Sequence, residues 1–389
     1  MIKRIQIKNF KCYGDPGVDF TLKRVNFIFG DNSAGKSTFL QLIRMIFNGE
    51  TESIDREFSK YVFRGETSRN IKMRVTALGR KDQREGDFVA SQTYAISKED
   101  PFHDSLGDSA TVINSCPVWQ YEKTIDKVSP LDCIGVFFPA NGEDGSGKLT
   151  RDSNEWPTAR QLIREYIPHV IHVEASRPER LGDFTVKSSL SDDVMLGSGA
   201  VEYVNSFFRS LNVPYTCVSR TMLRDNDFGV VIPRRNVGAG IDGLYETALK
   251  LYEWRNYREV SCVSTLGAQR ISGHALLALE EPESHVNERQ VSPLMNFLFE
   301  EAKEGANGQI VVECHSELMA LKLKNFVRSG LISPDDLAIH FAEKTPDGTI
   351  MHEIVMDEKG NYKTKWPNGG FFTERTKVVD EFFKAKQAR

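Results

Sequence analysis

The sequence has no long apolar run and little cysteine. No stretch of about 18 consecutive apolar residues, the usual minimum for a transmembrane helix, occurs anywhere in the chain. Residues 1–10 contain neither the apolar core nor the small-residue cleavage site of a secretion signal. The six cysteines lie far apart and form no C-x-x-C pair, which argues against a zinc ribbon and a disulfide framework. We therefore expect a cytoplasmic protein that does not span a membrane.

The sequence also lacks a strong net charge. It has 50 Lys and Arg residues against 54 Asp and Glu residues, for a formal net charge of −4 at pH 7. No global field therefore attracts nucleic acid or an anionic membrane, although a local basic patch could still bind nucleic acid. With 389 residues, of which 40% are hydrophobic, the chain can bury the core of one large or two ordinary domains.

A glycine-rich stretch near the N-terminus has the strongest local pattern. Residues 27–38 read FIFGDNSAGKST and contain the pattern G-x-x-x-x-G-K-[ST]. The apolar run 25–29 before it favours a strand, and residues 38–47 after it have helical spacing. Between a strand and a helix, such a loop surrounds phosphate oxygens with backbone N–H groups and the positive end of the helix dipole. The predicted nucleotide-binding residues are Gly30, Asp31, Asn32, Ser33, Ala34, Gly35, Lys36, Ser37 and Thr38.

Carboxylates follow an apolar run in the second half of the chain. Residues 276–279 read LLAL and lead directly into Glu280 and Glu281. In a nucleotide site, Glu280 can hold Mg²⁺ together with Ser37, and Glu281 can polarise a water for attack on the γ-phosphate. The alternative is a buried strand followed by a solvated acidic turn. The prediction requires these carboxylates to meet Lys36 at one triphosphate, across 244 positions (280 − 36).

A histidine follows the next predicted strand. A helix over about 287–303 precedes the buried strand 309–313, after which His315 leaves the sheet. A lone histidine is usually packed or exposed without function. Its position next to the strand that ends in carboxylates favours contact with the γ-phosphate or the attacking water. We therefore predict that Lys36, Glu281 and His315 catalyse Mg²⁺-dependent ATP hydrolysis.

Three of these motifs together resemble a known family. The segments FGDNSAGKST, LALEEPESHV and VVECHSE, in this order, resemble the P-loop, the Walker B motif with D-loop, and the H-loop of ABC-type ATPases. The ABC-type ATPases in question are those related to RecF, SMC heads and the OLD proteins. The opening segment IKNFKCYGD also resembles the first strand and turn of those heads. The resemblance implies an α/β fold: a P-loop NTPase, ABC-type ATPase head with an antiparallel side sheet and an inserted lobe. ATP and Mg²⁺ are the implied cofactors.

Two further segments resemble a bacterial subgroup of stand-alone AAA-type ATPases. EASRPER and WPNGGFF are similar to ATPase components of anti-phage defence loci, such as the partners in Septu-like and PARIS-like systems. OLD proteins append a Toprim nuclease, but the 74 residues after His315 (389 − 315) lack a D-x-D pair. The resemblance therefore implies a sensor or scaffold ATPase that controls a separate effector, a nuclease or toxin. The alternatives are a RecF-like DNA-binding repair ATPase and a hub that binds ATP without turning it over.

In that family two subunits meet head to tail, and each supplies a signature loop to the nucleotide of the other. The resemblance therefore implies a homodimer or higher homo-oligomer formed through the ATP sites. One candidate loop is 235–240, in which Asn236, Gly238 and Gly240 precede a predicted helix. The competing candidate is 264–269, which has the serine but lies close to the Walker B strand.

Several single residues are weaker candidates. Lys11 matches the basic residue that related heads place by the nucleotide, and Arg177 with Arg180 could stabilise developing phosphate charge. Solvated surface residues are the alternative for all three. Gln83 and Gln92 are candidates for a Q-loop glutamine by position only.

Other elements follow from periodicity. Alternation predicts a first strand over residues 2–7 and another over 70–78, which together suggest an antiparallel sheet beside the nucleotide core. A short strand is expected at 170–173, and helices are expected over 200–211 and 243–257.

These patterns divide the chain into four parts. From residue 81 the pattern weakens, and Gly, Ser and Asp clusters interrupt short β-like runs. We expect a loop-rich insertion there. The parts are 1–80, the N-terminal part of the head with the P-loop; 81–165, the variable insertion; 166–345, the C-terminal part with signature loop, Walker B and H-loop; and 346–389, the tail.

Overall fold

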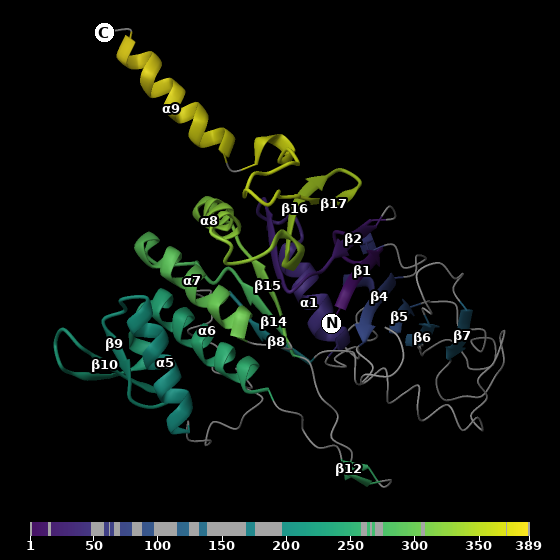
Figure 1. Cartoon of the computed structure of the whole chain (residues 1–389), viewed down its shortest axis with the longest axis horizontal. Coiled ribbons are helices and arrows are strands. Elements are labelled where there is room, and N and C mark those ends of the chain that lie inside the picture. The colour runs from purple at the N-terminus through teal and green to yellow at the C-terminus, as the bar shows by residue number, and fades with distance from the viewer. Residues whose placement is uncertain are drawn as a thin grey trace.

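The structure contains two six-stranded sheets with helices between and around them (Figure 1). It is a computed structural model. It describes residues 2–14, 17–47, 58–61, 63–65, 71–79, 88–96, 115–123, 132–137, 169–175, 197–257, 263–264, 267–268, 275–304, 308–370 and 372–387.

The core sheet is mainly parallel. Its order is β17 (Gly348–Glu353), β16 (Leu337–Thr345), β3 (Val25–Gly30), β15 (Gln309–Glu313), β14 (Ala275–Glu280) and β8 (His169–Val173). All neighbours pair in parallel except β16 and β17. Every residue of β3 and β15 is buried, as expected for parallel strands covered on both faces. The predicted strands before the P-loop, before Glu280 and before His315 are therefore confirmed as neighbours in one sheet.

The side sheet is antiparallel throughout, as the sequence predicts. Its order is β2 (Val18–Thr21), β1 (Ile2–Lys8), β4 (Ile71–Gly79), β5 (Phe88–Ile96), β6 (Ser115–Lys123) and β7 (Asp132–Phe137). The range 81–165, expected to be a loop-rich insertion, thus contributes three strands that extend this sheet. These strands were not predicted because strand formation depends on pairing with a neighbouring strand, which local composition does not reveal. The division at residue 80 falls between the neighbouring strands β4 and β5.

Helices cover the core sheet on both faces (Figure 1). The helix α1 lies between the core sheet and the side sheet, and α5, α6, α7 and α8 lie on the opposite face. This three-layer arrangement buries both faces of the parallel strands. The helices are α1 (Lys36–Phe47), α5 (Ser198–Ser210), α6 (Ala239–Arg255), α7 (Glu288–Glu304) and α8 (Glu317–Arg328).

The remaining described elements are short or peripheral. They are α3 (Phe58–Tyr61), η1 (Phe63–Gly65), β9 (Tyr215–Cys217), β10 (Met222–Asp225), β11 (Val231–Pro233), η4 (Arg234–Asn236), β12 (Val263–Ser264), β13 (Gly267–Ala268), η5 (Pro334–Asp336), η6 (Pro367–Gly369) and α9 (Phe372–Gln387). The strands β9, β10 and β11 form a small antiparallel sheet that packs beside α5. No helix in the described ranges is long and apolar enough to cross a membrane.

Strand alternation divides the core into two clusters. On the face toward α1, Ile28, Val311 and Ala278 pack with α1 and with Ile5 of the side sheet. On the other face, side chains such as Val312 pack with the helices α5 to α8. Because side chains alternate along a strand, the last residues of β14 and β15 point toward α1. Alternation therefore directs the carboxylates at these strand ends toward the P-loop helix.

A buried glutamine joins the two sheets. The amide of Gln309, which is only 4% exposed, donates to the carbonyl oxygens of Ile2 and Lys23 at 2.8 Å each. Its Oε1 accepts the N–H of Ile2 at 2.7 Å. The side chain thus bonds the first strand of the chain and the approach to β3 at the beginning of β15.

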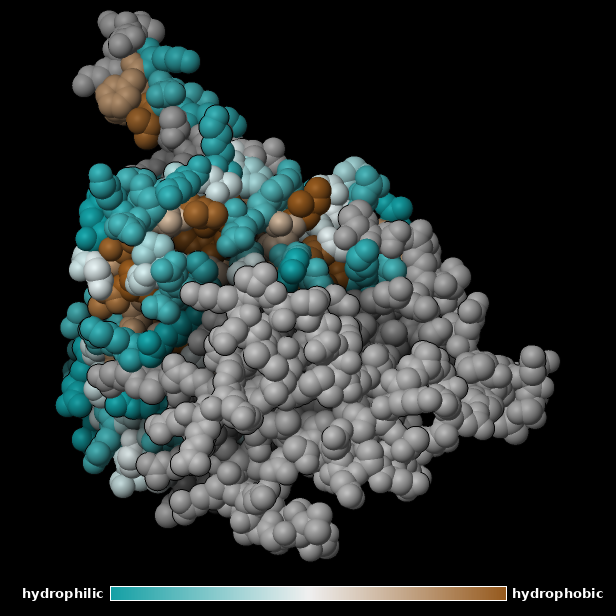
Figure 2. Space-filling model, turned by 45° about the vertical axis from the view of Figure 1, so that its right-hand side comes forward, coloured by the Kyte–Doolittle hydropathy of each residue, from teal (hydrophilic) through white to brown (hydrophobic). Residues whose placement is uncertain are grey.

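The helix α9 extends away from the rest of the molecule (Figure 1). Four of its apolar residues, Val378, Val379, Phe382 and Phe383, are exposed by 44% to 64%. Figure 2 shows the apolar side chains on this projecting helix. By contrast, Trp366, which precedes η6, is buried against Phe29 of β3 at a ring-centroid distance of 5.5 Å.

Candidate functional site

The glycine-rich loop connects the central strand β3 to α1. Gly30 ends β3 with φ 144°, and an added Cβ there would come within 2.3 Å of the Ala342 carbonyl oxygen. Gly35 has φ 97°, and an added Cβ would lie 2.4 Å from Cys12 Sγ. Ser33 has φ 60°, a left-handed conformation that is uncommon for residues other than glycine. The glycine spacing therefore reflects conformation and close packing at both ends of the loop.

Neighbouring side chains hold the loop through its carbonyl oxygens. The Tyr13 hydroxyl donates to the Gly35 carbonyl oxygen at 2.6 Å. The Thr349 hydroxyl of β17 donates to the Ala34 carbonyl oxygen at 2.9 Å. Both contacts use loop carbonyls and neither uses a loop N–H, which suits a loop whose N–H groups bind an anion.

Lys36 lies inside the loop. It is 3% exposed, and its ammonium donates to the carbonyl oxygens of Gly30 at 3.0 Å and Asp31 at 2.8 Å. Burial lowers the pKa of Lys36, while the nearby carboxylates of Glu313 and Glu281 oppose that shift. The structure thus brings Lys36 and Glu281 together, as the sequence predicts.

Glu313 at the end of β15 is the carboxylate that contacts Ser37. The Ser37 hydroxyl donates to Glu313 Oε1 at 2.8 Å, and Glu313 is only 2% exposed. Burial raises the pKa of Glu313 to about 7, partly offset by the Ser37 hydroxyl and the Lys36 ammonium. Its buried Oε2 has no hydrogen-bond partner among the described residues. A buried carboxylate oxygen without a partner next to a P-loop hydroxyl fits a divalent cation.

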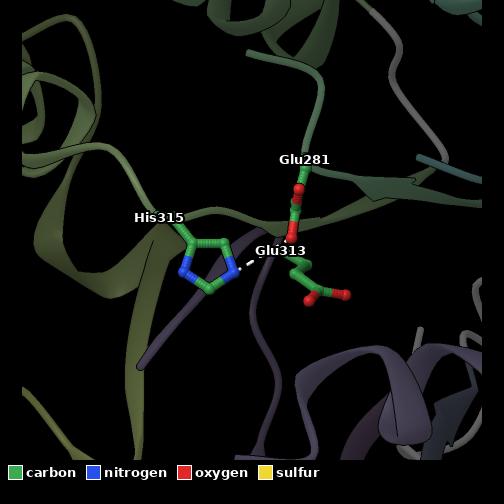
Figure 3. A group of neighbouring side chains, drawn as sticks. All are labelled: Glu281, Glu313 and His315. Carbon is green, nitrogen blue, oxygen red and sulfur yellow. Dashed lines mark ion pairs between the residues drawn. The ribbon is translucent and has the colours of Figure 1, made fainter. Parts of the chain in front are cut away.

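Glu281 and His315 meet just after the ends of the adjacent strands β14 and β15. Glu281 Oε1 lies 3.0 Å from His315 Nε2 (Figure 3). The backbone of Glu281 has φ 43°, and its N–H donates to the Glu313 carbonyl oxygen at 2.9 Å. Left-handed backbone in a residue other than glycine is a form of strain that clusters at functional sites. The ligand atoms of Glu281, Glu313 and His315 all lie within 4.8 Å of one another, which also suits a cation.

Glu283 accepts a hydrogen bond from the backbone of His315. Its Oε1 accepts the His315 backbone N–H at 2.7 Å. Burial raises the pKa of Glu283 to about 7, against the lowering effect of that hydrogen bond. Local pattern predicts no role for Glu283, because only the fold shows that the turn after β14 reaches the end of β15.

Glu280 contacts a histidine of the edge strand, and its predicted role as a cation ligand stays a prediction. Its Oε1 lies 2.9 Å from Nε2 of His172 on β8, and not against Ser37. Glu280 and Glu313 are paired in register on adjacent parallel strands, so the two carboxylates leave the sheet side by side. Neither Glu313 nor His172 was predicted as a site residue. Alternation along the strands 309–313 and 169–173 was the available signal, but the strand order needed to use it was not.

The first candidate signature loop lies at the beginning of α6. Asn236 ends η4, and Gly238 immediately precedes the helix. An added Cβ at Gly240 would come within 2.2 Å of the His285 carbonyl oxygen, so this loop packs against the turn that follows β14. The competing candidate 264–269 instead includes parts of the paired strands β12 and β13. A helix beginning beside the Walker B turn suits the prediction better, and the assignment stays a prediction.

The weaker candidates are only partly described. The Lys11 ammonium donates to Gln41 of α1 and lies 5.2 Å from the ring centroid of Tyr61. Gln92 belongs to β5 in the side sheet. Arg177, Arg180 and Gln83 lie outside the described residues.

Fold and site define the class of the protein. A glycine-rich loop between a central parallel strand and a helix, with carboxylates at the neighbouring strand ends, is the head of a P-loop NTPase. Residues 4–115 match the family described as "AAA domain", and residues 332–382 match the family described as "Protein of unknown function (DUF3696)". The comparison with curated proteins found no match.

Solved SMC heads are similar to this chain in fold. One, bound to the C-winged helix domain of ScpA, has 12% sequence identity and a TM-score of 0.51, over 91% of this chain and 98% of that chain. The SMC head domain from Thermotoga maritima has 12% identity and a TM-score of 0.46 over the same shares. An SMC head with an extended coiled coil, bound to the C-terminal domain of ScpA derived from Pyrococcus furiosus, has 11% identity and a TM-score of 0.47, over 98% of this chain and 99% of that chain. The first of these likenesses supports the ABC-type head architecture.

Proposed function

We propose that this protein binds ATP with Mg²⁺ and hydrolyses it. One observation carries the proposal: Lys36, Ser37, Glu281, Glu313 and His315 come together at the carboxyl ends of the neighbouring strands β3, β14 and β15. In open parallel sheets, ligands bind at that edge. Phosphoryl transfer to water requires groups of these kinds: a buried ammonium such as Lys36, a hydroxyl bonded to a carboxylate, and a carboxylate paired with an imidazole.

Each side chain has a role in this proposal. The phosphates would take the place of the carbonyl contacts of Lys36, and Ser37 and Glu313 would hold Mg²⁺, with Glu280 as a further carboxylate. When bound, Mg²⁺ neutralises charge on the β- and γ-phosphate oxygens. Glu281 accepts a proton from the attacking water, and His315, 3.0 Å away, orients that carboxylate or contacts the γ-phosphate.

The binding step can be tested with the P-loop lysine. Lys36→Ala removes the buried ammonium, so calorimetry should show at least about a hundredfold weaker Mg-ATP binding, as expected for a lost charge-assisted contact. Lys250→Ala is the matched control, because Lys250 pairs with Glu253 on α6, away from the loop. Equal affinities of both variants and the wild type would contradict nucleotide binding at this loop.

The chemical step can be tested with Glu281. Glu281→Gln keeps the size of the side chain but removes its basicity, so hydrolysis should fall by about 10² to 10⁴-fold while ATP binding is retained. Single-turnover measurements separate the two effects. A wild-type protein that binds Mg-ATP but turns over no faster than this variant would be a nucleotide-locked hub and not an ATPase.

We further propose that ATP closes a head-to-tail homodimer and that the protein is the sensor or scaffold of an anti-phage system with a separate effector. The support is the family resemblance of EASRPER and WPNGGFF, together with the helix start at Gly238. A similar SMC head was solved with a domain of another protein bound to it. Light scattering of Glu281→Gln with and without ATP tests dimerisation. Co-purification from cells under the same two conditions tests the effector.

A further inference from the structure

A second hydrogen-bonded group lies on the α1 face of the core sheet, next to the proposed site. His172 of β8 contacts Glu280 of β14 through Nε2 and Oε1 at 2.9 Å. Their side chains are only 6% and 11% exposed. Arg44, two turns after Ser37 on α1, lies with its NH1 atom 3.4 Å from His172 Nδ1 and 3.0 Å from Glu174 Oε1. Three adjacent elements, α1, β8 and β14, therefore converge on one imidazole.

The neighbours of His172 determine which ring nitrogen carries the proton. An arginine can only donate hydrogen bonds, so Nδ1 facing Arg44 acts as the acceptor. The proton of the neutral ring is then on Nε2, which donates to Glu280. The histidine thus offers its single donor to one carboxylate oxygen. A second donor, the Ala175 N–H, lies 3.4 Å from Glu280 Oε2.

This contact separates two carboxylates that begin side by side. Glu280 and Glu313 are register partners on adjacent strands, and the charge of Glu280 is one of the causes that raise the pKa of Glu313. Bound to His172, Glu280 leans toward the edge strand β8, whereas Glu313 faces Ser37 at 2.8 Å. Without the imidazole, Glu280 would lose its closest donor and could compete for the position facing Ser37.

We infer that His172 is a positioning residue for the cation-binding carboxylates, which it acts on through Glu280. The inference rests on the proposed function, since it concerns the Mg²⁺ that accompanies ATP. His172 itself touches neither the P-loop nor Glu313 through any hydrogen bond described in the structure. Its effect is therefore on how much Mg²⁺ strengthens nucleotide binding, and not on nucleotide binding as such.

The test measures the affinity for a non-hydrolysable ATP analogue by calorimetry, with Mg²⁺ and in EDTA. The ratio of the two affinities is the gain due to the cation. His172→Ala should lower this gain about tenfold, comparable to the loss of one hydrogen bond to a charged group. In EDTA its affinity should stay within about twofold of wild type. His172→Gln places an amide donor near Nε2, and its gain should return to within about threefold of wild type.

The chain provides a matched control. His352 of β17 makes the same type of contact, Nε2 to Glu343 Oε2 at 2.8 Å, on the hairpin of β16 and β17. His352→Ala should leave the cation gain unchanged. Thermal unfolding of every variant identifies simple loss of stability, which would lower both affinities together.

The outcomes separate this inference from the proposed function. A wild type that fails to bind the analogue contradicts the proposed function itself. A wild type with a clear cation gain that His172→Ala leaves unaltered overturns the positioning role alone. A gain lowered equally in His172→Ala, His172→Gln and the control also overturns it. Should His172→Ala not fold, a His172→Gln protein compared with Glu280→Gln decides the question, because both retain side-chain volume and should differ by at least threefold in the gain.

Discussion

Two glutamates at adjacent strand ends have opposite surroundings in this protein. Glu280 ends β14 and Glu313 ends β15, and the two are paired in register on the same face of the core sheet. Glu280 binds an imidazole from the edge strand, whereas Glu313 binds the Ser37 hydroxyl of the P-loop helix. The residue type and the position within the strand are equivalent. The difference comes from the other neighbour of each strand: β14 lies beside the edge strand β8, whereas β15 lies beside the P-loop strand β3.

The comparison also explains the electrostatics of the central strand. Glu313 is only 2% exposed and interacts with Ser37 and Lys36 as well as with the two other glutamates Glu280 and Glu281. Burial outweighs the nearby ammonium, so the pKa of Glu313 rises to about 7. An ion that neutralises a carboxylate in such a place offsets its desolvation, which is the physical reason to place the cation there.

The largest expected effect separates the two glutamates by substitution. Glu313→Ala removes the carboxylate facing Ser37 and should lower Mg²⁺-dependent hydrolysis by about 10² to 10³-fold, as for other groups that hold transition-state charge. Glu280→Ala should lower it by only about tenfold, because Glu280 acts from one strand further away. Steady-state rates at saturating ATP and Mg²⁺ measure both. The reverse order would support the sequence-based assignment of Glu280 as the principal ligand.

A smaller effect is expected from the Ser37 hydroxyl, which we propose binds the cation beside Glu313. Ser37→Ala removes a donor to Glu313 and a cation ligand, and should lower hydrolysis by about 10 to 100-fold. Ser210→Ala, which removes a hydroxyl bonded within α5, is the control and should have no effect on the rate. If Ser37→Ala were as active as that control, the contact between Ser37 and Glu313 would have no part in catalysis.

The raised pKa of Glu313 predicts a pH dependence. A carboxyl whose folded-state pKa is about 7, above its ordinary 4.5, stabilises the free protein below pH 4.5 and loses that contribution as pH rises through about 7. Cation binding needs the ionised form, so the gain in ATP affinity due to Mg²⁺ should rise by up to about tenfold per pH unit from 6 to 7 and level off near 8.

Calorimetry with and without Mg²⁺ across this pH range measures the effect. Glu313→Gln has no carboxyl to titrate at this position, so its plot of cation gain against pH should be flat. Folding stability should still depend on pH in this variant, because Glu283 also has a pKa raised to about 7. A wild-type curve as flat as that of the variant would show that Glu313 ionises well below neutral pH.

The smallest effect on activity is expected at the other end of β15. Gln309→Ala removes three hydrogen bonds to the backbone of Ile2 and Lys23, two of which are buried, and should destabilise the fold by about 1–3 kcal/mol. Hydrolysis per folded molecule should change little, since the site lies at the opposite end of the strand. Thermal unfolding and active-site titration measure the two quantities. Gln290→Ala on α7 is the control. An equal loss of stability in both variants would contradict the stabilising role of the Gln309 side chain between the two sheets.

Local pattern was sufficient for much of the site. Lys36 and Ser37 follow from glycine spacing between a strand and a helix, and Glu281 and His315 follow from apolar runs that end in polar residues. The structure shows these side chains close together. The three strands described in the range 81–165 were not predicted, because short β-like runs form strands only when they pair with other strands, which the local sequence does not identify.

By itself, the sequence determined where strands end, where the backbone must turn at Gly30 and Gly35, and which face each strand residue takes. These properties depend on a few neighbouring residues, through steric limits on φ and the alternation of side chains. Only the tertiary structure decided that Glu313 meets Ser37 and that Glu280 meets His172. The order of strands in a sheet arises from packing across the whole chain, so no local pattern encodes which carboxylate lies beside the P-loop.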